Sequence, residues 1–150
     1  MDTPFGIPTE TGYGRRFEPG MKLFRGRFVL ERLLGRGGMG EVWLARDTEL
    51  GDQRALKFVP RELTSSAAAL AQLRREASAG RKLSHPRIVK VDEFYSDTEE
   101  GVAAVAMEYV EGRTLADLQT MMPKGFFEPS EIKTWIADAC EALDYAHHDV

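Results

Sequence analysis

Three closely spaced glycines are the residues in this sequence whose type and spacing most clearly suggest chemistry. Gly35, Gly37 and Gly40 form a Gly-x-Gly-x-x-Gly motif, and Val42 follows it. Because glycine has no Cβ, such a segment can lie close to a phosphate chain and direct several backbone N–H groups at it. The spacing therefore indicates the binding of a nucleotide through its phosphates.

The residues after the motif discriminate between the arrangements that use it. A dinucleotide-binding fold needs a helix to begin at the third glycine, and a Walker-type loop needs Lys followed by Ser or Thr. The segment from Glu41 to Ala45 is instead β-rich, which favours a strand–loop–strand hairpin that lies over a nucleotide. The alternative is a glycine-rich turn that binds no ligand.

Lys57 and Glu76 are charged residues in patterns that predict burial. Lys57 lies within the apolar strand expected at residues 54–59, and Glu76 shares a helical face with Leu73. Since a buried charge is costly unless it is paired, we expect the helix to pack on the sheet and Glu76 to pair with Lys57. The alternative is that Lys57 extends to water and that Glu76 is exposed within the charged run 74–76.

The elements that would position these residues follow from periodicity and turn signals. Together they predict an α+β domain in which an antiparallel meander is followed by a long helix, two more strands and further helices. Strands are expected at residues 28–34, 41–46, 54–59, 88–94 and 102–109. Helices are expected at residues 67–83, 114–121 and 130–147, with Thr64, Ser65 or Ser66 capping the first and Thr114 the second.

The first 23 residues have a different composition from the rest. They contain three prolines and four glycines and show no apolar periodicity, so we expect a flexible leader over residues 1–23.

The composition excludes several classes of protein. With 24 acidic and 20 basic residues among 150, the net charge of −4 argues against a general nucleic-acid binder. The single cysteine, Cys140, cannot form an internal disulfide, and the longest apolar run, residues 102–107, is too short to span a membrane. We therefore expect a cytoplasmic location and no membrane contact from this segment.

Four segments, in order, resemble motifs of the protein kinases, in particular the bacterial serine/threonine kinases of eukaryotic type. They are Leu34–Asp47 (the glycine-rich loop), Ala55–Lys57 (the Val-Ala-Ile-Lys strand), Arg75–Val89 (the αC helix and His-Pro turn) and Val105–Gly112 (the hinge). The resemblance covers about residues 24–150. It implies an amino-terminal lobe at 24–108 with a five-stranded antiparallel sheet and one long helix, a hinge at 109–113, and the first helices of a carboxy-terminal lobe at 114–150.

The same resemblance implies an ATP site. In it, Lys57 contacts the α- and β-phosphates and Glu76 holds Lys57 in place. The backbone that covers the phosphates belongs to Gly35, Arg36, Gly37, Gly38, Met39 and Gly40. The adenine is enclosed by an apolar ceiling of Leu34, Val42 and Ala55, by the gatekeeper Met107, and by the backbone of Glu108 and Val110.

Two motifs of the resemblance are absent from the 150 residues. The sequence contains neither His-Arg-Asp nor Asp-Phe-Gly, so the ligands for Mg²⁺ are expected beyond residue 150 and the chain is expected to be a truncated kinase. The parent would transfer the ATP γ-phosphoryl group to Ser/Thr hydroxyls of proteins, and the fragment alone would be inactive. The alternative is a non-catalytic, pseudokinase-like interaction module.

The last expected helix carries two further features. His147 and His148 are adjacent and point in different directions, so we interpret them as a solvated helix end and expect no metal site. The apolar stripe of residues 130–147 has no partner in the predicted elements, so we expect self-association through this helix.

Overall fold

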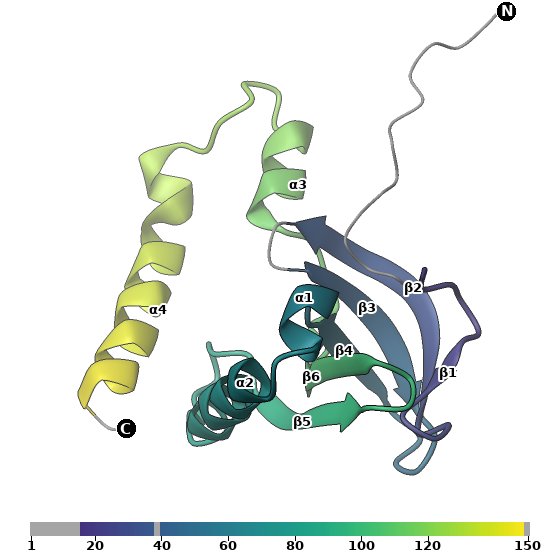
Figure 1. Ribbon diagram of the computed structural model, residues 1–150. Helices are drawn as coiled ribbons and strands as arrows, with labels where there is room; N and C mark the ends of the chain where they lie inside the picture. The colour runs from purple at the N-terminus through teal and green to yellow at the C-terminus, as the bar shows by residue number, and fades with distance from the viewer. Residues whose placement is uncertain (1–15, 38–39, 149–150) are drawn as a thin grey trace, which may run out of the picture.

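The computed structural model describes residues 16–37 and 40–148. Two of the expected loop residues, Gly38 and Met39, and the first 15 residues of the expected leader lie outside the described residues. Within the described parts the chain forms a six-stranded antiparallel sheet and four helices (Figure 1).

The sheet has the strand order β1-β2-β3-β4-β6-β5. Its strands are β1 (Lys22–Leu23), β2 (Phe28–Gly37), β3 (Gly40–Asp47), β4 (Gln53–Phe58), β5 (Val91–Asp97) and β6 (Val102–Glu108). The α+β class and the antiparallel sheet are confirmed, but the expected count of five strands is one too low. The additional strand, β1, is only two residues long and so gives no periodic signal.

The folded region begins earlier than the leader boundary at residue 23 implies. Phe17 and Leu23 are buried, and Leu23 pairs with Phe28 across β1 and β2. Phe17 stacks on Phe58 with the ring centroids 4.0 Å apart. The end of the expected leader is therefore wrong, because single apolar residues in a Pro- and Gly-rich segment bury themselves without showing a sequence period.

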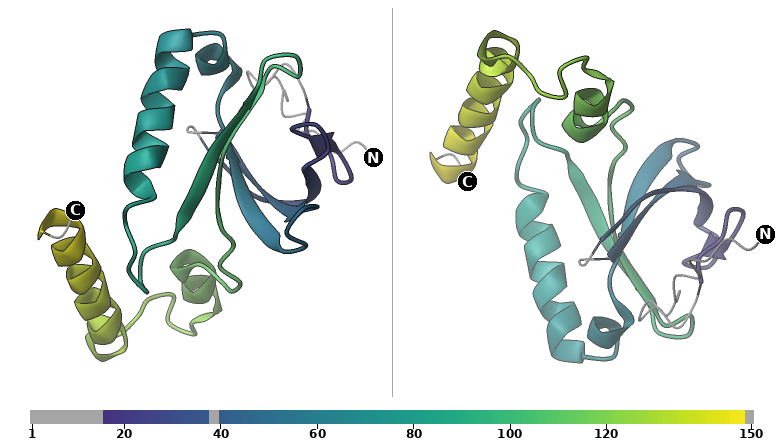
Figure 2. Two further views of the ribbon diagram at one scale, coloured as in Figure 1. Left: turned by 90° about the horizontal axis from the view of Figure 1, so that it is seen from below. Right: turned by 90° about the horizontal axis from the view of Figure 1, so that it is seen from above.

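One face of the sheet is covered by a hydrophobic core rich in aromatic residues. Its members are Phe17, Leu23, Phe24, Phe28, Leu30, Trp43, Ala45, Leu56, Phe58, Val102, Ala104 and Ala106. Tyr95 of β5 contacts Phe28 of β2 with ring centroids 5.0 Å apart, although β3, β4 and β6 lie between these two strands in the strand order. The sheet therefore curls strongly around this core, as Figure 2 shows.

The helix α2 (Ala67–Gly80) lies on the other side of the sheet, where it packs against β5 and the short helix α1 (Arg61–Thr64). Ser66 caps α2 by accepting a hydrogen bond from the Ala69 amide. It is one of the three residues predicted to cap this helix. The helix ends at Gly80, three residues before the predicted end. A Cβ at Gly80 would lie 3.2 Å from Cγ2 of Val91, so glycine allows this close approach to β5.

The last two helices, α3 (Leu115–Met121) and α4 (Pro129–His148), lie within one residue of their predicted positions. Thr114 caps α3, as predicted, and it does so in a capping box with Asp117. Tyr145 of α4 stacks on His85 and accepts a hydrogen bond from the Ser84 amide, which ties α4 to the segment after α2. Among the described residues, no helix has the length and apolar character needed to cross a membrane.

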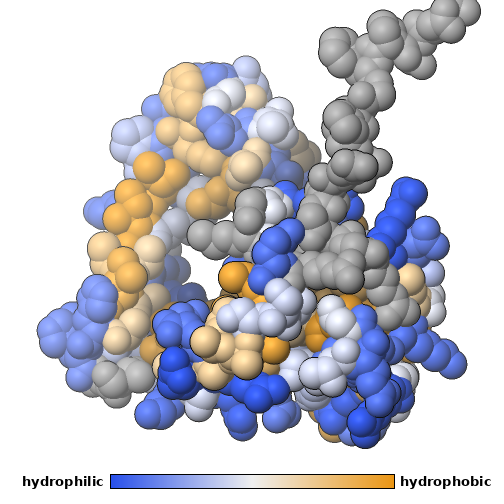
Figure 3. Space-filling view, viewed as in Figure 1, coloured by the Kyte–Doolittle hydropathy of each residue, from blue (hydrophilic) through white to orange (hydrophobic). Residues whose placement is uncertain are grey.

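The apolar stripe of α4 is exposed in this structure. Trp135, Ile136 and Leu143 are 38%, 55% and 57% exposed, and Figure 3 shows hydrophobic residues running along this helix. Trp135 contacts Phe127 edge-on, which is a local contact within the same end of the chain.

Candidate functional site

The strand register places Lys57 at the centre of the sheet face that lies opposite the core. Lys57 of β4 pairs with Val42 of β3 on one side and with Val105 of β6 on the other. In the next row, Ala55 lies between Leu44 and Met107. Because directly paired residues of antiparallel strands share a face, the sheet gathers four predicted site residues, Val42, Ala55, Lys57 and Met107, on one surface.

A cavity of about 530 Å³ lies between this face of the sheet and α2. Its lining includes three of the predicted site residues, Lys57, Glu76 and Met107. The other eight lining residues are all apolar, namely Phe58, Val59, Pro60, Leu63, Leu73, Ala77, Val91 and Val105. Residues from β4, α2 and β6 that are up to 50 positions apart therefore meet around one space.

Glu76 does not form the expected ion pair with Lys57. Among the described residues no carboxylate lies within 4.0 Å of the Lys57 ammonium, and Glu76 is exposed and accepts a hydrogen bond of 3.0 Å from Gln72 of the same helix. The expectation that Glu76 is buried is therefore wrong in this conformation. The reason is tertiary: α2 packs on β5, the edge strand, and the cavity separates it from β4.

The unpaired state of Lys57 still suits an anionic ligand. Its side chain is half-buried on an apolar surface, where an ammonium gains most from a partner of opposite charge. A phosphate that entered from the side of the β2–β3 hairpin would provide that partner, because Val42 of this hairpin is the direct neighbour of Lys57.

The glycine-rich segment forms the predicted strand–loop–strand hairpin. β2 and β3 pair up to Arg36 with Glu41 and Gly37 with Gly40. Gly40 has φ +118°, a conformation that side chains rarely adopt. No helix begins at Gly40, so the dinucleotide-binding arrangement is excluded for these residues.

The hairpin also contains a buried carboxylate that the sequence did not predict. Glu41 is 3% exposed, and its oxygens contact Arg36 (Nε–Oε1, 2.8 Å) and Trp43 (Nε1–Oε2, 2.9 Å). The only available signal was its position in the alternation Glu41, Trp43, Ala45, which is otherwise apolar.

The segment after β6 contains the remaining predicted residues. The Glu108 amide donates a hydrogen bond of 2.9 Å to the Lys90 carbonyl, and Val110 is 61% exposed. Tyr109 accepts a hydrogen bond of 2.7 Å from Arg32 of β2, and the guanidinium also lies over its ring. This pair joins the segment after β6 to β2, the strand that carries the half-buried Leu34.

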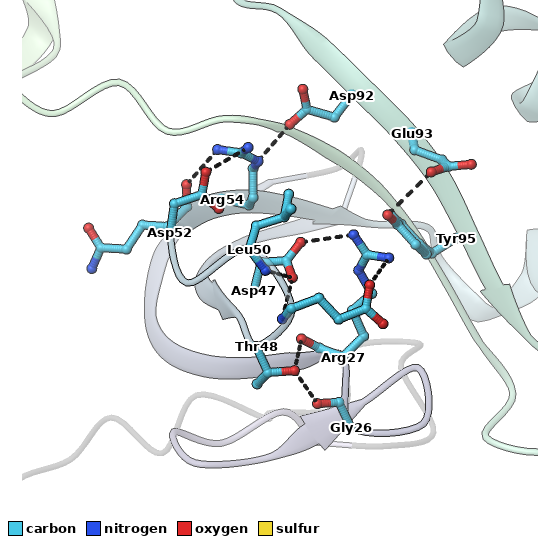
Figure 4. Close-up of polar contacts among 12 residues, drawn as sticks. Gly26, Arg27, Asp47, Thr48, Leu50, Asp52, Arg54, Asp92, Glu93 and Tyr95 are labelled. Atoms are coloured by element: carbon cyan, nitrogen blue, oxygen red, sulfur yellow. Dashed lines mark hydrogen bonds and ion pairs between the residues drawn. The ribbon is translucent and has the colours of Figure 1, made fainter.

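A second feature that sequence analysis missed is a polar network at the end of the sheet opposite to the glycines (Figure 4). Asp47 is 2% exposed and accepts hydrogen bonds from the amides of Glu49 and Leu50 and from Arg27. Burial alone would raise the pKa of Asp47, but these hydrogen bonds and the charge of Arg27 outweigh it and lower the pKa below its usual value. The network therefore holds the β3–β4 turn, which leads into the strand of Lys57.

The described residues contain no group of three His, Cys, Asp or Glu side chains that could hold a metal ion. His147 and His148 do not form such a site with other described residues, and the ring of His148 contacts Asp144 one turn earlier in α4.

Comparison with known proteins identifies the architecture. Residues 28–150 match the family model described as protein kinase domain. Among curated proteins, the chain is 38% identical over 125 residues to the serine/threonine-protein kinase PknB of Mycobacterium leprae, covering 82% of this chain and 20% of that protein. It is 37% identical over 128 residues to the probable serine/threonine-protein kinase SCO3848 of Streptomyces coelicolor, covering 81% of this chain and 18% of that protein.

Solved structures of kinase domains have the same fold as this chain. A double mutant of the Mycobacterium tuberculosis PknI kinase domain superposes with a TM-score of 0.75 at 24% identity, over 89% of this chain and 53% of that chain. The chain thus spans about half of that domain and about a fifth of the length of the curated relatives.

Proposed function

The chain belongs to the protein kinase family, and from this premise we propose that it forms the ATP-binding part of a serine/threonine protein kinase. The observation that carries the proposal is that Lys57, Glu76 and Met107 line one cavity, and that Lys57 pairs across the strands with Val42 of the glycine-rich hairpin. The residues predicted from separate motifs thus come together in one place with the chemistry that a nucleoside triphosphate requires.

In the proposed site the triphosphate lies between the hairpin and Lys57. The ammonium of Lys57 binds the α- and β-phosphates, while the backbone N–H groups of Gly35, Arg36, Gly37 and Gly40 contact them from above. Gly38 and Met39 belong to the same predicted set. Glycines fit this role because a Cβ at Gly35 or Gly37 would meet no atom within 4 Å, so this surface of the hairpin is open to a ligand.

The adenine lies on the apolar surface formed by Leu34, Val42 and Ala55, with Met107 at its inner end. Since the Glu108 amide is bound to the Lys90 carbonyl, Glu108 offers its carbonyl to adenine, and Val110 offers its amide. Such a flat apolar slot with a few backbone partners is the usual environment of a bound base.

Glu76 completes the site through a movement of α2. Because Glu76 and Lys57 line the same cavity, a shift of α2 toward β4 would bring the carboxylate to the ammonium and would reduce the cavity. The pair would then hold Lys57 in place for phosphate binding, whereas in the described conformation Glu76 is bound to Gln72.

We propose that the parent protein transfers the γ-phosphoryl group of ATP to Ser or Thr hydroxyls of protein substrates. The 150 residues alone would not do so, because they lack the aspartate that orients the hydroxyl and the ligands for Mg²⁺. The non-catalytic alternative is a kinase-like module that binds partners without transferring phosphate.

The test is phosphoryl transfer by the full-length parent with Lys57→Met. The change removes the cation but keeps a similar volume, so we expect activity to fall by about a hundredfold or more while the protein stays folded. Lys22→Met, at an exposed strand lysine, is the matched control and should keep wild-type activity. A Lys57→Met parent with normal turnover would refute the assignment of Lys57, and an inactive wild-type parent would favour the non-catalytic module.

We further propose that the isolated chain self-associates through the exposed stripe of α4, with a second copy of the same chain covering Trp135, Ile136 and Leu143. Sedimentation at increasing concentration should show a dimer or a larger species that Leu143→Lys weakens. A monomer at all concentrations would contradict this proposal.

A further inference from the structure

Glu41 is one of the two buried charged side chains among the described residues, and the proposed nucleotide site does not use its carboxylate. The other is Asp47, which ends the same strand. Side chains two residues apart along a strand share a face, so Glu41, Trp43 and Asp47 all face the core. Since a buried carboxylate is costly unless it has partners, the partners of Glu41 indicate its role.

The two carboxylate oxygens of Glu41 contact two different parts of the hairpin. Oε1 lies 2.8 Å from Nε of Arg36, which belongs to β2 and is the direct cross-strand partner of Glu41. Oε2 accepts a hydrogen bond of 2.9 Å from the indole Nε1 of Trp43. The carboxylate thus connects the β2 arm of the hairpin with a side chain of the core.

Trp43 provides a fixed anchor for this connection. It is 4% exposed and belongs to the hydrophobic core. Phe17 contacts it edge-on with the ring centroids 6.4 Å apart, and Phe17 is itself stacked on Phe58. The indole is therefore held by packing, and a hydrogen bond from it can restrain the carboxylate.

The hairpin has little other side-chain packing near the glycines. A Cβ added at Gly35 or Gly37 would have no neighbour within 4 Å, and the side chain of Arg36 is 45% exposed. Backbone pairing and the Arg36–Glu41 contact are therefore what restrains the described end of the hairpin. The Glu41 side of this ion pair is almost fully shielded from water, which strengthens its attraction to the Arg36 guanidinium.

We infer that Glu41 is a positioning residue whose buried carboxylate orients the glycine-rich hairpin without touching the nucleotide. The inference rests on the proposed function for what the hairpin covers, but the restraint itself is a property of the free protein. Because the hairpin would contact phosphates, loss of the restraint weakens the binding of ATP more than that of adenosine.

The first test is hydrogen exchange of the backbone amides in the chain without nucleotide. In Glu41→Gln, amides at residues 35–37, 40 and 41 should exchange about tenfold faster, as expected for loss of a charge-assisted contact, while those of β4 and β6 are unchanged. The matched control is Glu31→Gln, which removes another cross-strand contact between β2 and β3, to Arg46, away from the glycines. Unchanged exchange at the hairpin in Glu41→Gln would overturn the inference.

A second variant covers the case in which Glu41→Gln destabilises the whole sheet. Arg36→Gln changes a half-exposed side chain and leaves the Trp43 hydrogen bond in place. It should raise exchange at the same hairpin amides without affecting β4 and β6. Hairpin protection equal to that of the wild type in Arg36→Gln would likewise contradict the inference.

The nucleotide measurement separates this inference from the proposed function. The ratio of ATP affinity to adenosine affinity should fall about tenfold in Glu41→Gln relative to the wild type. If the wild type binds neither ligand, the proposed function fails, while the exchange result still tests the restraint. If the wild type binds ATP and Glu41→Gln keeps the same ratio, the positioning role fails.

Discussion

The two faces of the sheet differ in what covers them. On the core face, Leu56 and Phe58 of β4 are almost fully buried against aromatic residues of other strands and of the amino-terminal segment. On the opposite face, Lys57 lies between them in sequence but is half-buried and borders a cavity. The same strand thus packs the core with one set of side chains, while the alternate set faces the cavity that we propose as part of the nucleotide site.

This difference shows how a short strand can serve two purposes. Apolar burial on one face stabilises the fold in proportion to the area removed from water. The other face can then carry a charge, which in the proposed function gains a partner when a phosphate binds. Three predictions test this division, in order of decreasing effect on stability.

The largest effect is expected for Phe58→Ala on the core face. Removing a buried aromatic ring that stacks on Phe17 should lower the free energy of unfolding by about 3–5 kcal/mol. Urea denaturation followed by tryptophan fluorescence measures the change. A loss below about 1 kcal/mol would show that the core face contributes less than its burial indicates.

An intermediate effect is expected for Asp47→Asn at the end of the core face. The loss of charge-assisted hydrogen bonds from Arg27 and from the turn amides should cost about 2 kcal/mol at neutral pH. Because the pKa of Asp47 is lower in the folded protein, this stabilisation is present above the unfolded pKa of about 3.9 and is lost as the pH falls through the folded pKa.

The difference between wild type and Asp47→Asn should therefore shrink in acid, as measured by urea denaturation at a series of pH values. Asp52→Asn is the control, since Asp52 pairs with Arg54 at the exposed end of the same turn. An Asp47→Asn effect that is as small as the control effect would contradict the role of the buried network.

The smallest effect on stability is expected for Lys57→Met. The side chain is half-buried and has no acidic partner among the described residues within 4.0 Å, so its loss should change the free energy of unfolding by no more than about 0.5 kcal/mol. Urea denaturation is again the measurement. A large loss would mean that Lys57 is structural and would remove the contrast between the two faces.

Features with a local pattern could be predicted from the sequence. The strand that begins at Gly40, the Thr114 cap and the α4 stripe all depend on neighbouring residues or on residues one helical turn away. The sheet face of Lys57 follows in the same way from strand alternation. These expectations agree with the structure because local geometry determines them.

Features that depend on residues far apart in the chain could not be predicted from the sequence. Asp47 is buried because Arg27, twenty residues earlier, reaches it, and Phe17 is buried because Phe58 lies beneath it. Helical periodicity placed Glu76 on the same side of α2 as Leu73, and both residues line the cavity, but the gap between Glu76 and Lys57 depends on how α2 packs against β5. No sequence period encodes that distance.

Calorimetric titration of the chain with ATP tests the central claim most directly. We predict binding that is measurable but weaker than about 1 μM, because the chain spans only about half of a kinase domain and the adenine slot needs both lobes to close it. We also predict at least a roughly tenfold loss of affinity in Lys57→Met. Equal ATP affinity in the wild type and Lys57→Met, or no binding by the wild type, would contradict the assignment of this sheet face as the nucleotide site.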